Sequence, residues 1–305
     1  MKNNAITGFQ TPLLHELLRD LRQAKQVKLI VSFIMESGVK LLIPALEELA
    51  QEKVQIKIIT GTYLNVTEPS AIFLLKHRLG NGLDIRFYAD QKISFHPKGY
   101  LIERDSEAIG YVGSSNLSYS ALVSGVEWNC RFVRSASPAE YAAFNATFDD
   151  IFAHHTAQVT DEILKQYAAR WRKNAFSDEN EFSSSIKKIE PRGAQIEALY
   201  CLDEARREGI KKGLVVAATG IGKTYLAAFD SRKYRKILFV AHREEILKQA
   251  YESFSLVRPN DSAGYFFGRI KDTEAVMLFA TIQTIGQNQY LTPEFFKPDE
   301  FDYRR

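Results

Sequence analysis

The sequence has little cysteine and no long hydrophobic run, and both absences narrow the class of protein. Its two cysteines, Cys130 and Cys201, match no metal-binding spacing, so neither a disulfide framework nor a zinc site is expected. No apolar run reaches the roughly 18 residues that a membrane-spanning helix needs. The N-terminal residues MKNNAITGFQ lack the apolar stretch of a secretory signal. We therefore expect a reduced, cytoplasmic protein with no membrane association.

An excess of charge of one sign is also missing. The chain carries 40 basic and 37 acidic residues, a net charge of +3, so any phosphate-binding surface has to be a local patch. Hydrophobic residues make up 45% and charged residues 25%, which is typical of a folded protein. At roughly 150 residues per domain, a chain of 305 residues predicts two domains.

Strand-like and helix-like segments alternate over the first 170 residues. The hydrophobic patterns predict strands at 27–34, 54–60, 83–88, 95–102, 109–112 and 126–133, and helices at 38–53, 69–79, 138–154 and 160–173. On this pattern Trp128 and Phe132 are interpreted as core residues of the last strand rather than as residues that stack on bases. Such alternation indicates an α/β fold, with a mixed sheet and flanking helices.

The pattern breaks at residues 174–190, which are polar and rich in serine, as in a linker. The block after it predicts a helix at 194–208, a strand at 213–217, a helix from Lys223, a strand at 236–240, a helix at 243–254 and a strand at 275–280. This order is typical of a parallel sheet. The expected domains are therefore 1–173 and 191–305, joined by the linker 174–190.

A phosphate-binding loop follows the predicted strand at 213–217. Its sequence, AATGIGKT at 217–224, fits the Walker A pattern except that Ala217 replaces the first glycine. In such a loop, backbone N–H groups surround the phosphates, a lysine reaches the β and γ phosphates, and a hydroxyl binds Mg²⁺. The candidate nucleotide-binding residues are Thr219, Gly220, Gly222, Lys223 and Thr224, with Thr224 as the Mg²⁺ ligand.

Three further segments occur in a diagnostic order around this loop, at 191–195, 240–247 and 280–284. Together with the loop they resemble the first RecA-like lobe of a superfamily 2 DEAD/DEAH-box helicase. The resemblance implies that Gln195 contacts adenine, that 241–247 and 280–284 touch the nucleic-acid backbone, and that the motor uses ATP and Mg²⁺. The chain reaches Arg305 before the acidic DExH box, so we expect a fragment with an incomplete lobe that does not hydrolyse ATP.

A second set of polar residues lies in the first block. His96 and Lys98 are two residues apart on a predicted strand, so both side chains are expected on one face. Ser114 and Asn116 follow the next predicted strand, and Glu127 lies on the one after it. The other histidines lack a lysine two positions later.

This set resembles the H-x-K and G-S-x-N signature of phospholipase D superfamily enzymes, whose bacterial nucleases carry a glutamate at the position of Glu127. The resemblance implies that His96 attacks phosphorus and forms a phosphohistidine without a metal ion or other cofactor. Glu127 would orient the imidazole, and Lys98 and Asn116 would stabilise the developing charge, with Ser114 in the same site. Glu103 stands where the family commonly has aspartate.

The signature normally occurs twice in a complete site, and this chain has one copy, which implies a homodimer through the first domain. Together the two resemblances predict a phospholipase D-like nuclease joined to the start of a helicase motor, as in bacterial restriction and defence enzymes. DNA is the expected substrate, with RNA left open. One alternative is a catalytically silent module for dimerisation and DNA docking. Another is lipid phosphodiester hydrolysis, which the fused motor disfavours.

Overall fold

A computed structural model describes residues 4–8, 11–62, 65–90, 93–171, 189–218, 220–290, 292–293, 295–297 and 299–304. The chain divides into two compact units, Met1–Phe182 and Ser183–Arg305. The linker expected at 174–190 lies for the most part outside the described residues. Each unit is a mixture of helices and strands, so the α/β class expected from the sequence is confirmed.

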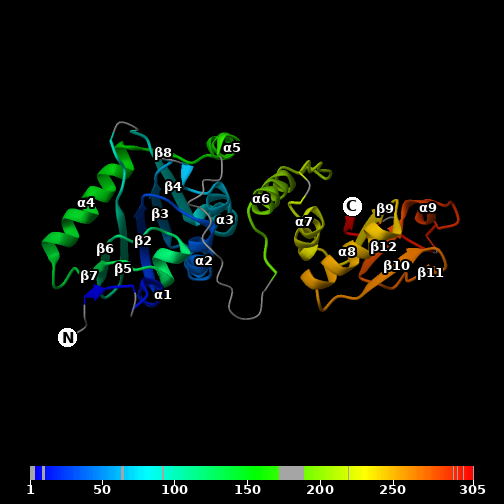
Figure 1. Ribbon diagram of the computed structural model, residues 1–305, viewed down its shortest axis with the longest axis horizontal. Helices are drawn as coiled ribbons and strands as arrows, with labels where there is room; N and C mark the ends of the chain where they lie inside the picture. The colour runs from blue at the N-terminus through cyan, green and yellow to red at the C-terminus, as the bar shows by residue number, and fades with distance from the viewer. Residues whose placement is uncertain are drawn as a thin grey trace. The chain divides into compact units, whose positions relative to one another are not determined.

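An eight-stranded mixed sheet forms the centre of the first unit, in the order β1-β7-β6-β5-β2-β3-β4-β8 (Figure 1). Its strands are β1 (Ala5–Ile6), β2 (Ala24–Val31), β3 (Gln55–Thr60), β4 (Leu83–Tyr88), β5 (Lys98–Arg104), β6 (Ala108–Gly113), β7 (Asn129–Val133) and β8 (Thr156–Gln158). β2, β3 and β4 run parallel, and the other pairings are antiparallel. The carboxyl ends of the three parallel strands therefore meet at one edge of the sheet.

Helices cover both faces of this sheet (Figure 1). They are α1 (Leu13–Leu21), α2 (Glu36–Gln51), α3 (Pro69–Leu79), α4 (Pro138–His154) and α5 (Asp161–Arg170). α4 lies on the face opposite α2 and α3, where it buries Tyr141, Phe148 and Phe152 against Leu101 and Phe132 of the sheet. Burial of each such side chain contributes about 1.5–3 kcal/mol.

A buried carboxylate ties α1 to the sheet. Asp20 is 1% exposed, and its oxygens accept hydrogen bonds from Arg19, from Arg131 of β7 and from the hydroxyl of Tyr111 of β6. Burial alone would raise the pKa of Asp20, but these hydrogen bonds hold it below its ordinary value. The α1 helix is thus anchored by a charge that has to stay ionised.

Two details differ from the expected strands, and both lie beside the candidate site. The strand expected from residue 95 begins at Lys98, because Pro97 has no N–H to donate to a neighbouring strand. His96 therefore precedes β5 and is exposed. The strand expected from residue 126 begins at Asn129, and Trp128 is 73% exposed, so its expected core position was wrong, whereas Phe132 is buried as expected.

A five-stranded sheet in the order β11-β10-β12-β9-β13 forms the second unit. Its strands are β9 (Ile237–Ala241), β10 (Ala263–Phe267), β11 (Ile270–Lys271), β12 (Met277–Thr281) and β13 (Tyr303–Arg304), and its helices are α6 (Ala194–Arg207), α7 (Lys223–Asp230), α8 (Glu244–Val257) and α9 (Ile282–Ile285). β10, β12, β9 and β13 are parallel, as expected for this block.

The strand expected at 213–217, immediately before the phosphate-binding loop, does not form. Leu214 and Val216 are 89% and 87% exposed, and residues 211–218 belong to no strand. The edge strand β13 comprises two described residues, Tyr303 and Arg304, so it offers few hydrogen-bonding groups to a further strand. A strand is stable only when a neighbouring strand completes its backbone hydrogen bonds and other residues cover its side chains.

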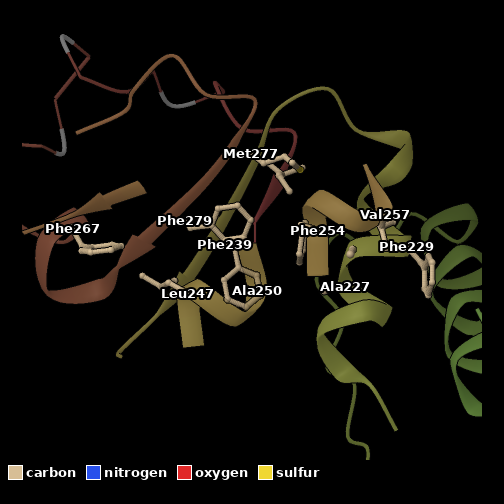
Figure 2. Packing of buried hydrophobic residues seen from close by; sticks show 12 residues of the cluster. Ala227, Phe229, Phe239, Leu247, Ala250, Phe254, Val257, Phe267, Met277 and Phe279 are labelled. Carbon is tan, nitrogen blue, oxygen red and sulfur yellow. The ribbon is translucent and has the colours of Figure 1, made fainter. Parts of the chain in front are cut away.

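Aromatic side chains dominate the core of the second unit (Figure 2). Phe239 of β9, Phe254 of α8 and Phe279 of β12 pack edge to face or tilted, with ring centroids 5.5 to 5.9 Å apart. Phe254 and Phe279 are fully buried. The sheet and α8 therefore form one core although the preceding loop has no strand.

Candidate functional site

Lys98 lies at the centre of the candidate site in the first unit. It is the first residue of β5, between β2 and β6, and it is 7% exposed. Its Nζ lies 2.7 Å from Nδ1 and 3.1 Å from Nε2 of His96, 3.0 Å from the His96 carbonyl oxygen and 3.0 Å from Oγ of Ser32. The ammonium group of Lys98 therefore lies within hydrogen-bonding distance of both ring nitrogens of His96.

The electrostatics of Lys98 connect it to Glu127. Burial lowers the pKa of Lys98, and the negative charge of Glu127 opposes that shift. The same charge adds to burial in raising the pKa of Tyr100, the next inward-facing residue of β5. Glu127 therefore lies close enough to affect the pKa of both Lys98 and Tyr100.

Glu127 itself is bonded to Ser114. The hydroxyl of Ser114 donates to the Glu127 carboxylate, the Trp128 N–H donates to Ser114 Oγ at 3.0 Å, and the Ser114 N–H donates to the Trp128 carbonyl oxygen at 3.0 Å. These bonds hold the segment before β7 against the end of β6. The Glu127 carboxylate, which is expected to orient His96, therefore bonds to Ser114, and its negative charge opposes the lowering of the Lys98 pKa.

Asn116 is held by the end of β2. It is 6% exposed, and its Oδ1 accepts a hydrogen bond from the Phe33 N–H at 3.2 Å. The following residue, Leu117, pairs with Ile34, and its carbonyl oxygen accepts from Met35 N–H at 2.9 Å. Because the oxygen of the Asn116 amide is used in this way, its NH₂ group is the donor available to a ligand.

Sequence reasoning missed Ser32. Its Oγ accepts from Lys98 and donates to the Pro97 carbonyl oxygen at 3.2 Å, so it holds both residues that follow His96. A signal was present: Ser32 directly follows an apolar parallel strand, and the carboxyl ends of such strands are where ligand-binding groups gather in α/β folds. Single polar residues at strand ends are too common for this signal to be decisive.

In the second unit, the predicted phosphate-binding loop makes hydrogen bonds among its own residues. Gly222 has the left-handed φ of +78° that allows the chain to turn into α7, and Gly220 has φ +88°. The Nζ of Lys223, the first residue of α7, donates to the carbonyl oxygens of Ala217 and Ala218 at 3.1 and 3.0 Å. Thr224 follows in the first turn of α7, and Thr219 lies outside the described residues.

Gln195, expected to contact adenine, is bonded to this loop instead. It is 7% exposed, and its Nε2 donates to the carbonyl oxygens of Ile221 and Gly222 at 2.9 and 3.2 Å. Its Oε1 accepts from the Arg192 N–H at 3.2 Å. The structure therefore brings Gln195 to the expected loop, where it takes loop carbonyl groups as partners.

The two segments expected at the nucleic-acid backbone follow neighbouring strands. Residues 241–247 begin at the last residue of β9 and residues 280–284 at the last two residues of β12, and these strands are adjacent and parallel. Nε2 of Gln283 donates to the carbonyl oxygen of His242 at 3.1 Å, and both residues are exposed together with Arg243. The segments thus form one polar surface at the carboxyl edge of the sheet.

Within the described parts of the chain, no three or more His, Cys, Asp and Glu side chains form a group that could hold a metal ion. Over the same residues, no helix has the length and apolar character needed to cross a bilayer.

Two family models match the chain. Residues 17–155 match "Cardiolipin synthase, PLD-like domain", and residues 188–303 match "Type III restriction enzyme, res subunit". The chain is also 32% identical over 82 residues to UvrABC system protein B of Methanococcoides burtonii, a match covering 27% of this chain and 12% of that protein. The corresponding protein of Streptococcus mutans is 34% identical over 90 residues, covering 29% and 13%.

Among solved structures, NucT from Helicobacter pylori is similar with 14% identity and a TM-score of 0.38, over 48% of this chain and 91% of that one. Nuc from Salmonella typhimurium, a phospholipase D family member, has 18% identity and a TM-score of 0.36, over 48% and 90%.

Proposed function

We propose that this chain, which joins a phospholipase D-like domain to part of a helicase-type domain, cleaves DNA phosphodiester bonds at His96 without a metal ion. The observation that carries the proposal is the contact between His96 and the buried ammonium group of Lys98, in the field of Glu127. This contact places the proposed nucleophile beside a positive charge at the start of β5.

The proposed reaction starts with attack by an imidazole nitrogen of His96 on phosphorus. The bond from phosphorus to the leaving nucleotide oxygen breaks, and a phosphohistidine forms. Lys98 and the NH₂ group of Asn116 donate to the nonbridging oxygens, where negative charge is concentrated in the transition state. These donors are preorganised, because Ser32 holds Lys98 and Phe33 holds Asn116.

The leaving oxygen needs a proton, which this chain does not supply from a second H-x-K pair. We infer a homodimer in which His96 of the second copy donates that proton. Water then attacks phosphorus and gives a proton to the same second imidazole, so His96 is released and both rings return to their starting state. Glu127, with Ser114, supplies the negative charge that balances the imidazolium formed in the reaction.

The helicase-type domain is proposed to use ATP and Mg²⁺ in the whole protein. Lys223 and the backbone around Gly220 and Gly222 would hold the phosphates, Thr224 would bind Mg²⁺, and Gln195 would turn from the loop to adenine. In the whole protein, hydrolysis of bound ATP would supply the free energy for moving along DNA, and Mg²⁺ would stabilise the charge on the phosphates. Such a pairing of nuclease and motor fits restriction or defence against foreign DNA.

DNA cleavage in excess EDTA tests the nuclease proposal. The wild-type chain is expected to cleave, His96→Ala to be inactive, and His15→Ala, which changes an exposed histidine of α1, to remain active. Cleavage by His96→Ala at the wild-type rate contradicts the assignment of the nucleophile. DNA binding without cleavage by the wild-type chain would support the docking module instead.

A further inference from the structure

His96 has an unusual setting for a proposed nucleophile. It is exposed, and it precedes β5 rather than lying within the strand, so no sheet hydrogen bonds fix it. A nucleophile that attacks phosphorus in line has to be held within a fraction of an ångström. The question is therefore which contacts hold the short segment Phe95–Pro97.

Phe95, the residue before His96, is held between two strand ends. Its ring stacks on the ring of Tyr88, the last residue of β4, with centroids 4.5 Å apart and planes at 19°. The ring also lies beside Gly61, the residue after β3. A Cβ added at Gly61 would lie 3.1 Å from the Phe95 ring and 3.0 Å from the Ser32 carbonyl oxygen. Glycine therefore leaves the space in which the ring sits.

Pro97, the residue after His96, is held by the end of a third strand. Its carbonyl oxygen accepts the hydroxyl hydrogen of Ser32, the residue after β2. Ser32 is in turn fixed to Gly61, whose N–H donates to the Ser32 carbonyl oxygen at 3.2 Å. The carbonyl oxygen of Gly61 accepts a hydrogen bond from the Thr67 hydroxyl at 2.6 Å, so both backbone polar groups of Gly61 are hydrogen-bonded.

The three holding residues come from adjacent parallel strands. Ser32, Gly61 and Tyr88 stand at the carboxyl ends of β2, β3 and β4. Each contacts a residue next to His96 in the chain: Ser32 contacts Pro97, and Gly61 and Tyr88 contact Phe95. We call these three residues the His96 seat.

We propose that the His96 seat positions the imidazole for attack on phosphorus, so that Ser32, Gly61 and Tyr88 are positioning residues of the nuclease. The proposal rests on the proposed function of His96. A displacement of about 1 Å at a reacting group costs about 10²-fold in rate, whereas DNA binding depends on other contacts. Loss of the seat should therefore lower the rate of the chemical step and leave DNA affinity unchanged.

The test compares Tyr88→Leu, Tyr88→Phe and Gly61→Ala in the full chain, with Phe144→Leu as a control that removes a partly exposed ring from α4. Single-turnover cleavage and DNA affinity are measured separately. Tyr88→Leu and Gly61→Ala are expected to lose about 10²-fold in rate with unchanged affinity. Tyr88→Phe keeps the stack and should stay within threefold of wild type, as should Phe144→Leu.

A second measurement does not depend on cleavage. The imidazole ¹³C signal of His96 is expected to be sharp in the wild type and in Tyr88→Phe, and broadened by exchange in Tyr88→Leu. Wild-type rates in both Tyr88→Leu and Gly61→Ala, or a sharp His96 signal in Tyr88→Leu, would contradict the proposal that the His96 seat positions the imidazole. If the wild-type chain cleaves nothing, the proposed function fails, and the NMR comparison still decides whether the seat exists.

Discussion

Replacing Asp20 by asparagine removes a buried negative charge on which the first unit depends. Asp20 is 1% exposed, and its carboxylate lies 3.0 Å from Arg19, 3.0 Å from Arg131 and 3.9 Å from Arg104. The Arg131 side chain is 12% exposed, so in the variant its charge stays largely buried without its partner. Removing one partner of a buried pair costs about 3–5 kcal/mol. Because the Arg19 side chain is 37% exposed, water can solvate its charge in the variant. We therefore expect the free energy of unfolding to fall by an amount at the lower end of this range, about 3 kcal/mol.

Tryptophan fluorescence during urea unfolding measures this loss in the first unit alone, because Trp128 and Trp171 are the two tryptophans of the chain. The matched control is Asp105→Asn, which removes a carboxylate that is 81% exposed and should change the free energy of unfolding by less than about 0.5 kcal/mol.

The pH dependence gives an independent check. The pKa of Asp20 is lowered in the folded state, so its contribution to stability is present above the unfolded pKa of about 3.9 and is lost as pH falls through the folded value. The wild type and Asp20→Asn should therefore differ most near neutral pH and converge in acid. A loss below about 1 kcal/mol at pH 7, or a difference that does not shrink in acid, would refute the reasoning.

The remaining predictions concern the core, the support of the site and its charge. Phe279→Ala empties a fully buried position in the second unit and should lower its free energy of unfolding by about 3–5 kcal/mol, measured by hydrogen exchange; a loss under 1 kcal/mol would contradict the described core. Tyr167→Phe removes the hydroxyl that donates to the Thr67 carbonyl oxygen at 2.7 Å and should cost about 1 kcal/mol in urea unfolding, whereas no loss would show that the bond is not formed. Lys98→Met keeps the buried volume and removes the charge, so single-turnover cleavage should fall by at least about 10²-fold, and an unchanged rate would exclude Lys98 from the site.

Local sequence signals predicted the elements that have clear boundaries. α3 and β4 have the expected ends because Pro69 starts the helix and the glycines at 80 and 82 separate it from the strand. The start of β5 was misplaced because hydrophobicity continues through Phe95 while Pro97 cannot join the ladder.

The strand at 213–217 and the position of Trp128 show what local patterns miss. An apolar run forms a strand only beside a partner, and partners are set by tertiary structure. The candidate site residues could be picked out because their types and spacing are unusual. Ser32 and Tyr88 could not, because their roles arise only where three strand ends meet around Phe95.

The central claim is that His96 becomes covalently bonded to phosphorus. Mass spectrometry of the chain after brief incubation with DNA in EDTA and rapid quenching tests it most directly. An acid-labile nucleotide adduct on His96, absent from the His96→Ala variant, is the predicted result. Cleavage that leaves His96 unmodified at every time point, or that occurs only after Mg²⁺ is added, would contradict the account.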